Sequence, residues 1–345
     1  MKLKKFISYF FMAAFCISFI TSCSISANQQ PATREMFALD TIINLKYYGK
    51  NADKALDESV NRISDIEKKM SIFLSTSEIS QINANSGKKP VRISADTFYV
   101  VEKAYQQAKL SNGAFDPTVE PLTYLWGIGT PHQKIPSQSE IDKVKPLINY
   151  HDIIMDKNTL TVELRQRSQG LDFGGIAKGY SADELKKICR KYNINSALID
   201  LGGNVYAVGN NPDGTAWKIG VQNPLADTGQ YLGIVAATDK SLVSAGDYQR
   251  FFVQNGKTYG QIFDPSTGYP SANGIIGTTI LSDYSIDGDA LSNSLYVLGV
   301  DKGLKLIESL KGTDALCITS DKKIYLTPGM KKVFQLTDTS YKIAN

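Results

Sequence analysis

The spacing of apolar positions predicts several helices along this chain. Apolar side chains recur every three or four residues, as on one face of a helix, over residues 51–70, 94–110, 289–298 and 302–310. Ser94 can cap the second of these helices, and Asn112 and Gly113 favour the left-handed conformation that would end it. A further helix is expected from Tyr180 onward, where apolar residues again fall near one face.

Alternating apolar and polar positions, bounded by turn residues, predict strands between these helices. The expected strands span residues 41–48, 159–164, 197–201, 217–221, 232–237, 250–253 and 275–281, with a final hairpin through 316–319 and 323–326. Because strands at hairpin spacing are interspersed with helices, the pattern favours the α+β class over a regular parallel α/β sheet. Residues 130–139 are polar and contain proline, which predicts a surface loop. No long polar linker divides the chain, so we expect one compact body, with room for two lobes.

The N-terminus has the layout of an export signal. A lysine-rich start precedes an apolar run over residues 6–20, which is too short to span a membrane comfortably, and small residues follow it. The tetrad ITSC at residues 20–23 resembles a lipobox, in which Cys23 would be lipidated and become the mature N-terminus. The alternatives are an uncleaved anchor and an ordinary signal peptide that is cut nearby.

These features predict a lipoprotein signal peptide over residues 1–22, a flexible tether over 23–33 and one domain over 34–345. The protein is then expected to be exported and anchored through its lipid to the periplasmic or extracytoplasmic face of a membrane. Loss of the signal's three lysines lowers the formal net charge from +4 to +1. Charge therefore makes no case for nucleic acid as a partner.

Cysteine and histidine are too scarce to suggest a disulfide framework or a zinc centre. Cys189 and Cys317 remain in the predicted domain, and their apolar neighbours favour buried small hydrophobes, although they could pair in an oxidising compartment. The only histidines are His132 and His151, which argues against a histidine-built zinc site.

A glycine-rich turn precedes the helix expected after Tyr180. The stretch DFGGIAKGY at residues 172–180 contains an acid, two adjacent glycines, Lys178 and a third glycine. Adjacent glycines let the backbone turn sharply and approach a ligand, and the N–H groups of a helix N-terminus suit a phosphate. Taken alone, such a turn can also simply connect two elements.

A second segment carries oxygen ligands. Asp289, Ser292 and Asn293 are spaced at i, i+3 and i+4, which places them on one helical face. Oxygen ligands of this kind suit Mg²⁺, although Asp289 could instead be an ordinary helix cap. A phosphate-binding turn and a carboxylate-bearing helix together indicate metal-assisted pyrophosphate chemistry.

With these motifs the chain resembles the ApbE family of FAD:protein FMN transferases, formerly called thiamine-biosynthesis lipoproteins. Residues 172–183 are similar to the family signature DFGGIAKGYAVD. The resemblance continues, in order, through FDPTV at 115–119, LGGN at 201–204, SAGDY at 244–248, DPSTGYP at 264–270 and DALS at 289–292. It implies an α+β, T-fold-like architecture with mixed, largely antiparallel sheets flanked by helices, and a FAD site between two lobes.

The resemblance also implies a reaction and its residues. The expected activity is Mg²⁺-dependent transfer of FMN from FAD to a Thr or Ser of an exported or membrane redox protein, with release of AMP. Gly175 (through its carbonyl), Asp289 and Asn293 would bind Mg²⁺, and Asp289 and Lys178 would serve catalysis. The residues implied at the FAD site are Leu39, Phe73, Ala114, Phe115, Asp116, Asp172, Lys178 and Ile262.

Two positions depart from the family pattern. Asn293 stands where threonine is usual, and an amide oxygen can still bind Mg²⁺. Gln261 stands where many members have a histidine that is thought to deprotonate the acceptor hydroxyl. Glutamine cannot act as a general base, and losing one typically costs about 10²–10⁴-fold in rate. The alternatives for accepting this proton are Asp264 and Asp289.

Two further hypotheses stay open. A Mg²⁺-dependent FAD pyrophosphatase would release free FMN and AMP, with water replacing a poorly activated threonine. A flavin-binding lipoprotein would hold FAD without catalysis. A lipoprotein that binds thiamine or another small molecule would leave Asp289 and Lys178 unexplained.

Overall fold

The computed structural model describes residues 30–248 and 250–345, and Pro31–Asn345 form one compact unit. The predicted signal peptide, the lipidation at Cys23 and most of the predicted tether lie outside the described residues. Within the described part of the chain, no helix is both long and apolar enough to cross a membrane.

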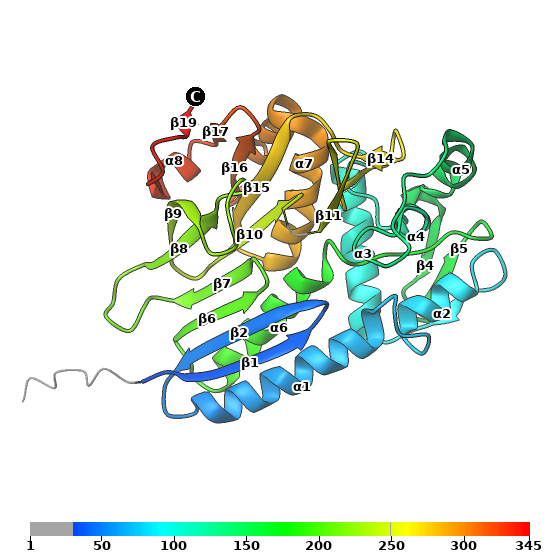
Figure 1. Ribbon diagram of the computed structural model, residues 1–345. Helices are drawn as coiled ribbons and strands as arrows, with labels where there is room; N and C mark the ends of the chain where they lie inside the picture. Colours follow the sequence, from blue (N-terminus) through cyan, green and yellow to red (C-terminus); the bar gives the residue numbers. More distant parts are fainter. Residues whose placement is uncertain (1–29, 249) are drawn as a thin grey trace, which may run out of the picture. The chain divides into compact units, whose positions relative to one another are not determined.

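A nine-stranded sheet organises this unit (Figure 1). All neighbouring strands are antiparallel except the last pair, which is parallel. In spatial order the strands are β1 (Ala32–Ala38), β2 (Thr41–Tyr48), β6 (Ser196–Leu201), β7 (Asn204–Gly209), β10 (Lys240–Gly246), β15 (Ile275–Ser282), β16 (Asp314–Thr319), β17 (Lys323–Leu326) and β19 (Lys342–Ile343).

Three long helices pack on this sheet because each has an apolar face. Helices α1 (Ala52–Met70) and α6 (Ala177–Lys191) share a core with β1, β2, β6 and β7, where Leu56 and Leu185 are fully buried. Helix α7 (Ser285–Glu308) packs on β15 and β16 through residues such as Leu295. Burial of these apolar faces is the main force that holds the helices against the sheet.

A second part of the unit lies beside the first and carries helix α3 and several short elements (Figure 1). Its core is built on Phe98, Val101 and Phe173, and a neighbouring cluster surrounds Trp126. Its elements are α2 (Glu78–Ala84), β3 (Val91–Arg92), α3 (Ala95–Leu110), α4 (Glu120–Trp126), α5 (Gln138–Val144), η1 (Lys145–Leu147), η2 (Tyr150–Asp152), β4 (Ile153–Asp156) and β5 (Thr161–Leu164).

Short strands complete the structure. A three-stranded sheet is formed by β8 (Trp217–Gln222), β9 (Tyr231–Ala237) and β18 (Phe334–Leu336), with α8 (Met330–Val333) nearby in the chain. Two hairpins follow β10, namely β11 (Phe251–Gln254) with β12 (Lys257–Gly260) and β13 (Phe263–Asp264) with β14 (Tyr269–Pro270).

The α+β class with largely antiparallel sheets is confirmed, and so are the helix capped by Ser94 and the final hairpin. For the helix expected over residues 289–298, the predicted start was wrong. Helix α7 begins at Ser285 and breaks at Gly299, where φ is 81°, so Asp289 lies inside the helix and is not its cap. The predicted loop is also shorter than expected, because Ser137 caps α5 within it. Strand β1 begins at Ala32, inside the stretch predicted as a tether.

Candidate active site

A cavity of about 1840 Å³ lies between the nine-stranded sheet and the part of the unit that carries α3 and α4. Its lining combines apolar walls with a few charged groups, as small-molecule sites commonly do. Every residue of the predicted FAD and metal sites in the described chain lines it: Leu39, Phe73, Ala114, Phe115, Asp116, Asp172, Gly175, Lys178, Gln261, Ile262, Asp289 and Asn293. The fold therefore brings together residues that are up to 254 positions apart, and their individual roles stay predictions.

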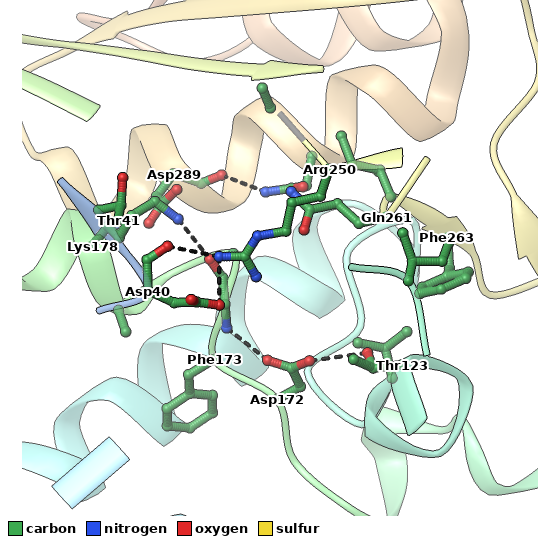
Figure 2. Close-up of a pocket in the computed structure, with 18 of the residues that line it drawn as sticks. Asp40, Thr41, Thr123, Asp172, Phe173, Lys178, Arg250, Gln261, Phe263 and Asp289 are labelled. Carbon is green, nitrogen blue, oxygen red and sulfur yellow. Dashed lines mark hydrogen bonds and ion pairs between the residues drawn. The ribbon is translucent and has the colours of Figure 1, made fainter. Parts of the chain in front are cut away.

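Asp172 organises the glycine turn at one wall of the cavity (Figure 2). Its carboxylate accepts hydrogen bonds from Gly174 N at 2.8 Å and from Thr123 Oγ1 on α4 at 3.0 Å. The Lys178 ammonium donates to the Gly174 carbonyl at 2.9 Å. The acid thus holds the turn in shape and ties it to α4, which explains an acidic side chain beside a predicted phosphate site.

The turn does not offer the row of free amides that the sequence suggested. Gly174 N is bound by Asp172, and the N–H groups of Ile176 and Ala177 donate to the Phe173 carbonyl at 3.0 and 2.9 Å. Gly179 N donates to Asp289 Oδ2 at 2.9 Å. Most amides of the turn are thus already satisfied, and the Lys178 ammonium is the cationic group that this turn presents to an anion.

Close packing explains two of the glycines. A Cβ on Gly179 would lie 2.3 Å from the Ser285 carbonyl oxygen, where α6 crosses the start of α7. A Cβ on Gly175 would lie 2.9 Å from Asn293 Nδ2. Neither glycine has a positive φ, so space rather than backbone conformation requires them.

Helices α6 and α7 are also joined by hydrogen bonds in which a carboxylate on each helix accepts from backbone N–H groups of the other. Asp183 on α6 accepts hydrogen bonds from the backbone N–H groups of Ser285 and Ile286 at 2.8 and 3.0 Å, and thereby caps α7. Asp289 on α7 accepts from Gly179 on α6. Burial raises the pKa of Asp183 to about 6. Sequence reasoning missed this cap because its partners lie about a hundred residues away.

Gly175, Asp289 and Asn293 meet where the turn contacts α7. Asp289 is only 3% exposed, and burial raises its pKa while Lys178 acts in the opposite direction. Asn293 Nδ2 donates to the Asp289 carbonyl at 3.0 Å, which leaves the Asn293 amide oxygen available. Ser292 does not join this set, because its hydroxyl donates to the same carbonyl at 2.7 Å. The remaining carboxylate and amide oxygens beside Gly175 fit a hard cation such as Mg²⁺.

This set contains a single carboxylate. No group of three or more His, Cys, Asp and Glu side chains suited to a metal occurs among the described residues. A cation at this site would therefore need backbone and amide oxygens as further ligands. Mg²⁺ is commonly bound by one or two carboxylates together with phosphate oxygens of the substrate.

Asp116 lines the cavity, but its carboxylate is committed to local structure. It accepts hydrogen bonds from Thr118 N and Thr118 Oγ1 at 2.8 and 2.6 Å and from Tyr150 N at 3.0 Å. Its role is thus to shape the loop that displays Ala114 and Phe115.

Glu120 and Arg250 are among the charged residues of the cavity that were not singled out from the sequence. Glu120, in the first turn of α4, has no hydrogen bond from a described residue, and burial together with nearby Asp172 raises its pKa to about 7. Arg250 reaches across the cavity to Asp40. Neither lies at a recognisable motif position, so only their surroundings in the fold distinguish them.

The family model for ApbE matches residues 39–317 of this chain. This protein belongs to the ApbE family. A relative from Klebsiella pneumoniae named FAD:protein FMN transferase is 33% identical over 87% of this chain and 93% of its own length. Another of that name, from Treponema pallidum, is 28% identical over 93% of this chain and 94% of its own length.

Solved structures of ApbE proteins have the same fold. The ApbE protein from Thermotoga maritima superposes with a TM-score of 0.82 at 28% identity, covering 88% of this chain and 99% of that one. The flavinyl transferase ApbE from Pseudomonas stutzeri superposes with a TM-score of 0.78 at 25% identity, over 88% and 97% of the two chains. The ApbE-like fold expected from the sequence is therefore confirmed.

Proposed function

We propose that this ApbE protein transfers FMN from FAD to a Thr or Ser hydroxyl of an acceptor protein and releases AMP. The observation that carries the proposal is the single cavity on which all the predicted site residues of the described chain meet, with Lys178 and Asp289 at one wall. Relatives named FAD:protein FMN transferase, which this chain matches over most of its length, support the same reaction.

In this reaction the acceptor oxygen forms a bond to the phosphorus of the FMN half of FAD. The bond from that phosphorus to the oxygen bridging to AMP breaks, and AMP leaves with the bridging oxygen. The acceptor hydroxyl transfers its proton to a base, for which Asp264 and Asp289 are the candidates. The Lys178 ammonium, held by the Gly174 carbonyl, is placed to stabilise negative charge on the phosphate oxygens.

Mg²⁺ held by the Gly175 carbonyl, Asp289 and Asn293 would neutralise part of the charge of the diphosphate. Gln261 lines the cavity and can orient the acceptor hydroxyl, but an amide cannot accept its proton.

We further propose that the protein is exported and anchored through a lipid on Cys23. The support is the signal-like order of basic, apolar and small residues at the N-terminus. Its acceptors would then be exported or membrane redox proteins that carry a Thr or Ser flavinylation site.

The test is incubation of the purified mature protein with FAD and Mg²⁺, with and without an acceptor protein of one of the named relatives. We expect acceptor-dependent AMP release and an acceptor mass increased by one FMN residue. Asp289→Ala should abolish both, and Arg190→Ala, an exposed change outside the cavity, should not. AMP release that is equal without acceptor would favour the FAD pyrophosphatase, which Gln261 motivates. Intact FAD after long incubation would refute both activities.

A further inference from the structure

Arg250 and Asp40 form an ion pair across the candidate FAD cavity (Figure 2). The Nη2 atom of Arg250 lies 2.5 Å from Asp40 Oδ2, and it also donates a hydrogen bond to the Asp40 backbone carbonyl at 2.7 Å. Asp40 belongs to the turn between β1 and β2, whereas Arg250 directly precedes β11. The pair therefore joins two segments that are 210 residues apart.

The two partners are held very differently. Leu39 and Asp40 form a two-residue hairpin turn with φ of 51° and 58°, and strands β1 and β2 fix both ends of it. Leu39 N also donates to Glu67 Oε1 at 2.8 Å. Asp40 is thus a fixed acceptor. Arg250 forms no other ion pair with the described residues, and an arginine side chain has several rotatable bonds.

The pair is too exposed to be an effective structural clamp. The Arg250 and Asp40 side chains are 37% and 47% exposed. Ion pairs in such surroundings contribute little to stability, because water screens the charges and ordering two side chains costs entropy. Arg250 can therefore exchange Asp40 for another anion at little cost in free energy.

A dinucleotide in this cavity would supply that anion. Arg250, Lys178, Asp289 and Gln261 all line this cavity, and Figure 2 draws them together around it. A guanidinium can give two parallel hydrogen bonds to a phosphate, which an ammonium cannot match in geometry.

We propose that Arg250 is a phosphate-binding residue for FAD that rests on Asp40 while the cavity is empty and transfers to the diphosphate when FAD binds. The proposal rests on the proposed function for its ligand. Asp40 then competes with the FAD diphosphate for the Arg250 guanidinium. Asp40 therefore lowers the affinity for FAD, whereas Arg250 raises it.

Substitutions of Asp40 and Arg250 should change the affinity for FAD in opposite directions, which distinguishes partner exchange from a purely structural ion pair. If the pair only pinned the β1–β2 turn to the segment before β11, loss of either side chain would disturb the cavity in the same direction. If Arg250 exchanges partners, Asp40→Asn removes its charged partner, keeps only the bond to the backbone carbonyl and strengthens FAD binding. Arg250→Gln would weaken FAD binding.

The experiment measures the affinity of the mature protein for FAD and for riboflavin by flavin fluorescence, with EDTA present so that no turnover occurs. Riboflavin has no phosphate and reports the flavin pocket alone. We expect Arg250→Gln to weaken FAD binding about 10- to 100-fold, the usual effect of losing hydrogen bonds to a charged group. Asp40→Asn should strengthen it about 2- to 5-fold, since the competing pair is weak. The double variant should match Arg250→Gln, and riboflavin affinity should change less than about twofold throughout.

Arg190→Gln is the matched control, because it removes an exposed arginine outside the cavity, and thermal unfolding establishes that each variant is folded. The proposal is overturned if Arg250→Gln leaves FAD affinity unchanged, if Asp40→Asn weakens it, or if riboflavin binding falls in parallel. A wild-type protein that binds no FAD either with EDTA or with Mg²⁺ overturns both this inference and the proposed function. Failure of FMN transfer with the expected affinity changes would refute the proposed function alone.

Discussion

Glu120 is a half-buried carboxyl group whose replacement should stabilise the protein in a pH-dependent way. It stands in the first turn of α4, and its Oε2 occupies the space that a Cβ on Gly170 would fill, at 2.3 Å. No described residue donates a hydrogen bond to it, and Asp172 is nearby. Burial, reinforced by Asp172, raises its pKa from an ordinary 4.5 to about 7.

The sign of the effect follows from this shift. Because the folded state binds the Glu120 proton more tightly than the unfolded state, the fold loses stability as the pH rises from 4.5 through 7. The full pKa difference corresponds to about 3 kcal/mol above pH 7, and partial access to solvent reduces this to about 1–3 kcal/mol. Glu120→Gln removes the charge and keeps the shape of the neutral acid.

Urea unfolding of wild type and Glu120→Gln, without FAD or Mg²⁺, tests this reasoning. We expect the variant to be more stable by about 1–3 kcal/mol at pH 8 and by less than about 0.5 kcal/mol at pH 4.5, where Glu120 is protonated in the folded state and half protonated in the unfolded state. Measurement at the lower pH is the internal control for steric effects of the amide. A stability difference that is the same at both pH values, or a less stable variant at pH 8, would refute the assignment.

Two further predictions concern the glycine turn and the acceptor side of the cavity. Gly179→Ala should lower the free energy of unfolding by about 1–3 kcal/mol or prevent folding, because its Cβ would lie 2.3 Å from the Ser285 carbonyl oxygen. Urea unfolding of the purified variant tests this, and unchanged stability would contradict the packing of α6 on α7. Gln261→His should speed acceptor-dependent FMN transfer by up to about 10²-fold with little change in FAD affinity, since it adds a group that can accept the hydroxyl proton. Single-turnover rates measure this, and equal rates would mean that another group, such as Asp289, serves as the base.

Much of this protein could be predicted from its sequence because the relevant signals are local. Helical spacing located α1 and α3, and Ser94 marked the cap of α3. The resemblance to the ApbE family, carried by motifs along the chain, implied which residues from Leu39 to Asn293 would share a site, and they do line one cavity. Boundaries were less accurate where local signals compete. Strand β1 lies at a sheet edge with one face largely exposed, so its pattern resembles that of a polar tether.

Only the tertiary structure decided what these residues do to one another. It showed that Asp172 ties the turn to Thr123, that most of the turn's amides are already bound, and that Asp183 caps a helix far along the chain. It also gave Glu120 and Arg250 their significance. The physical reason is that desolvation and charge pairing depend on neighbours in space, whereas periodicity and turn chemistry depend on neighbours in sequence.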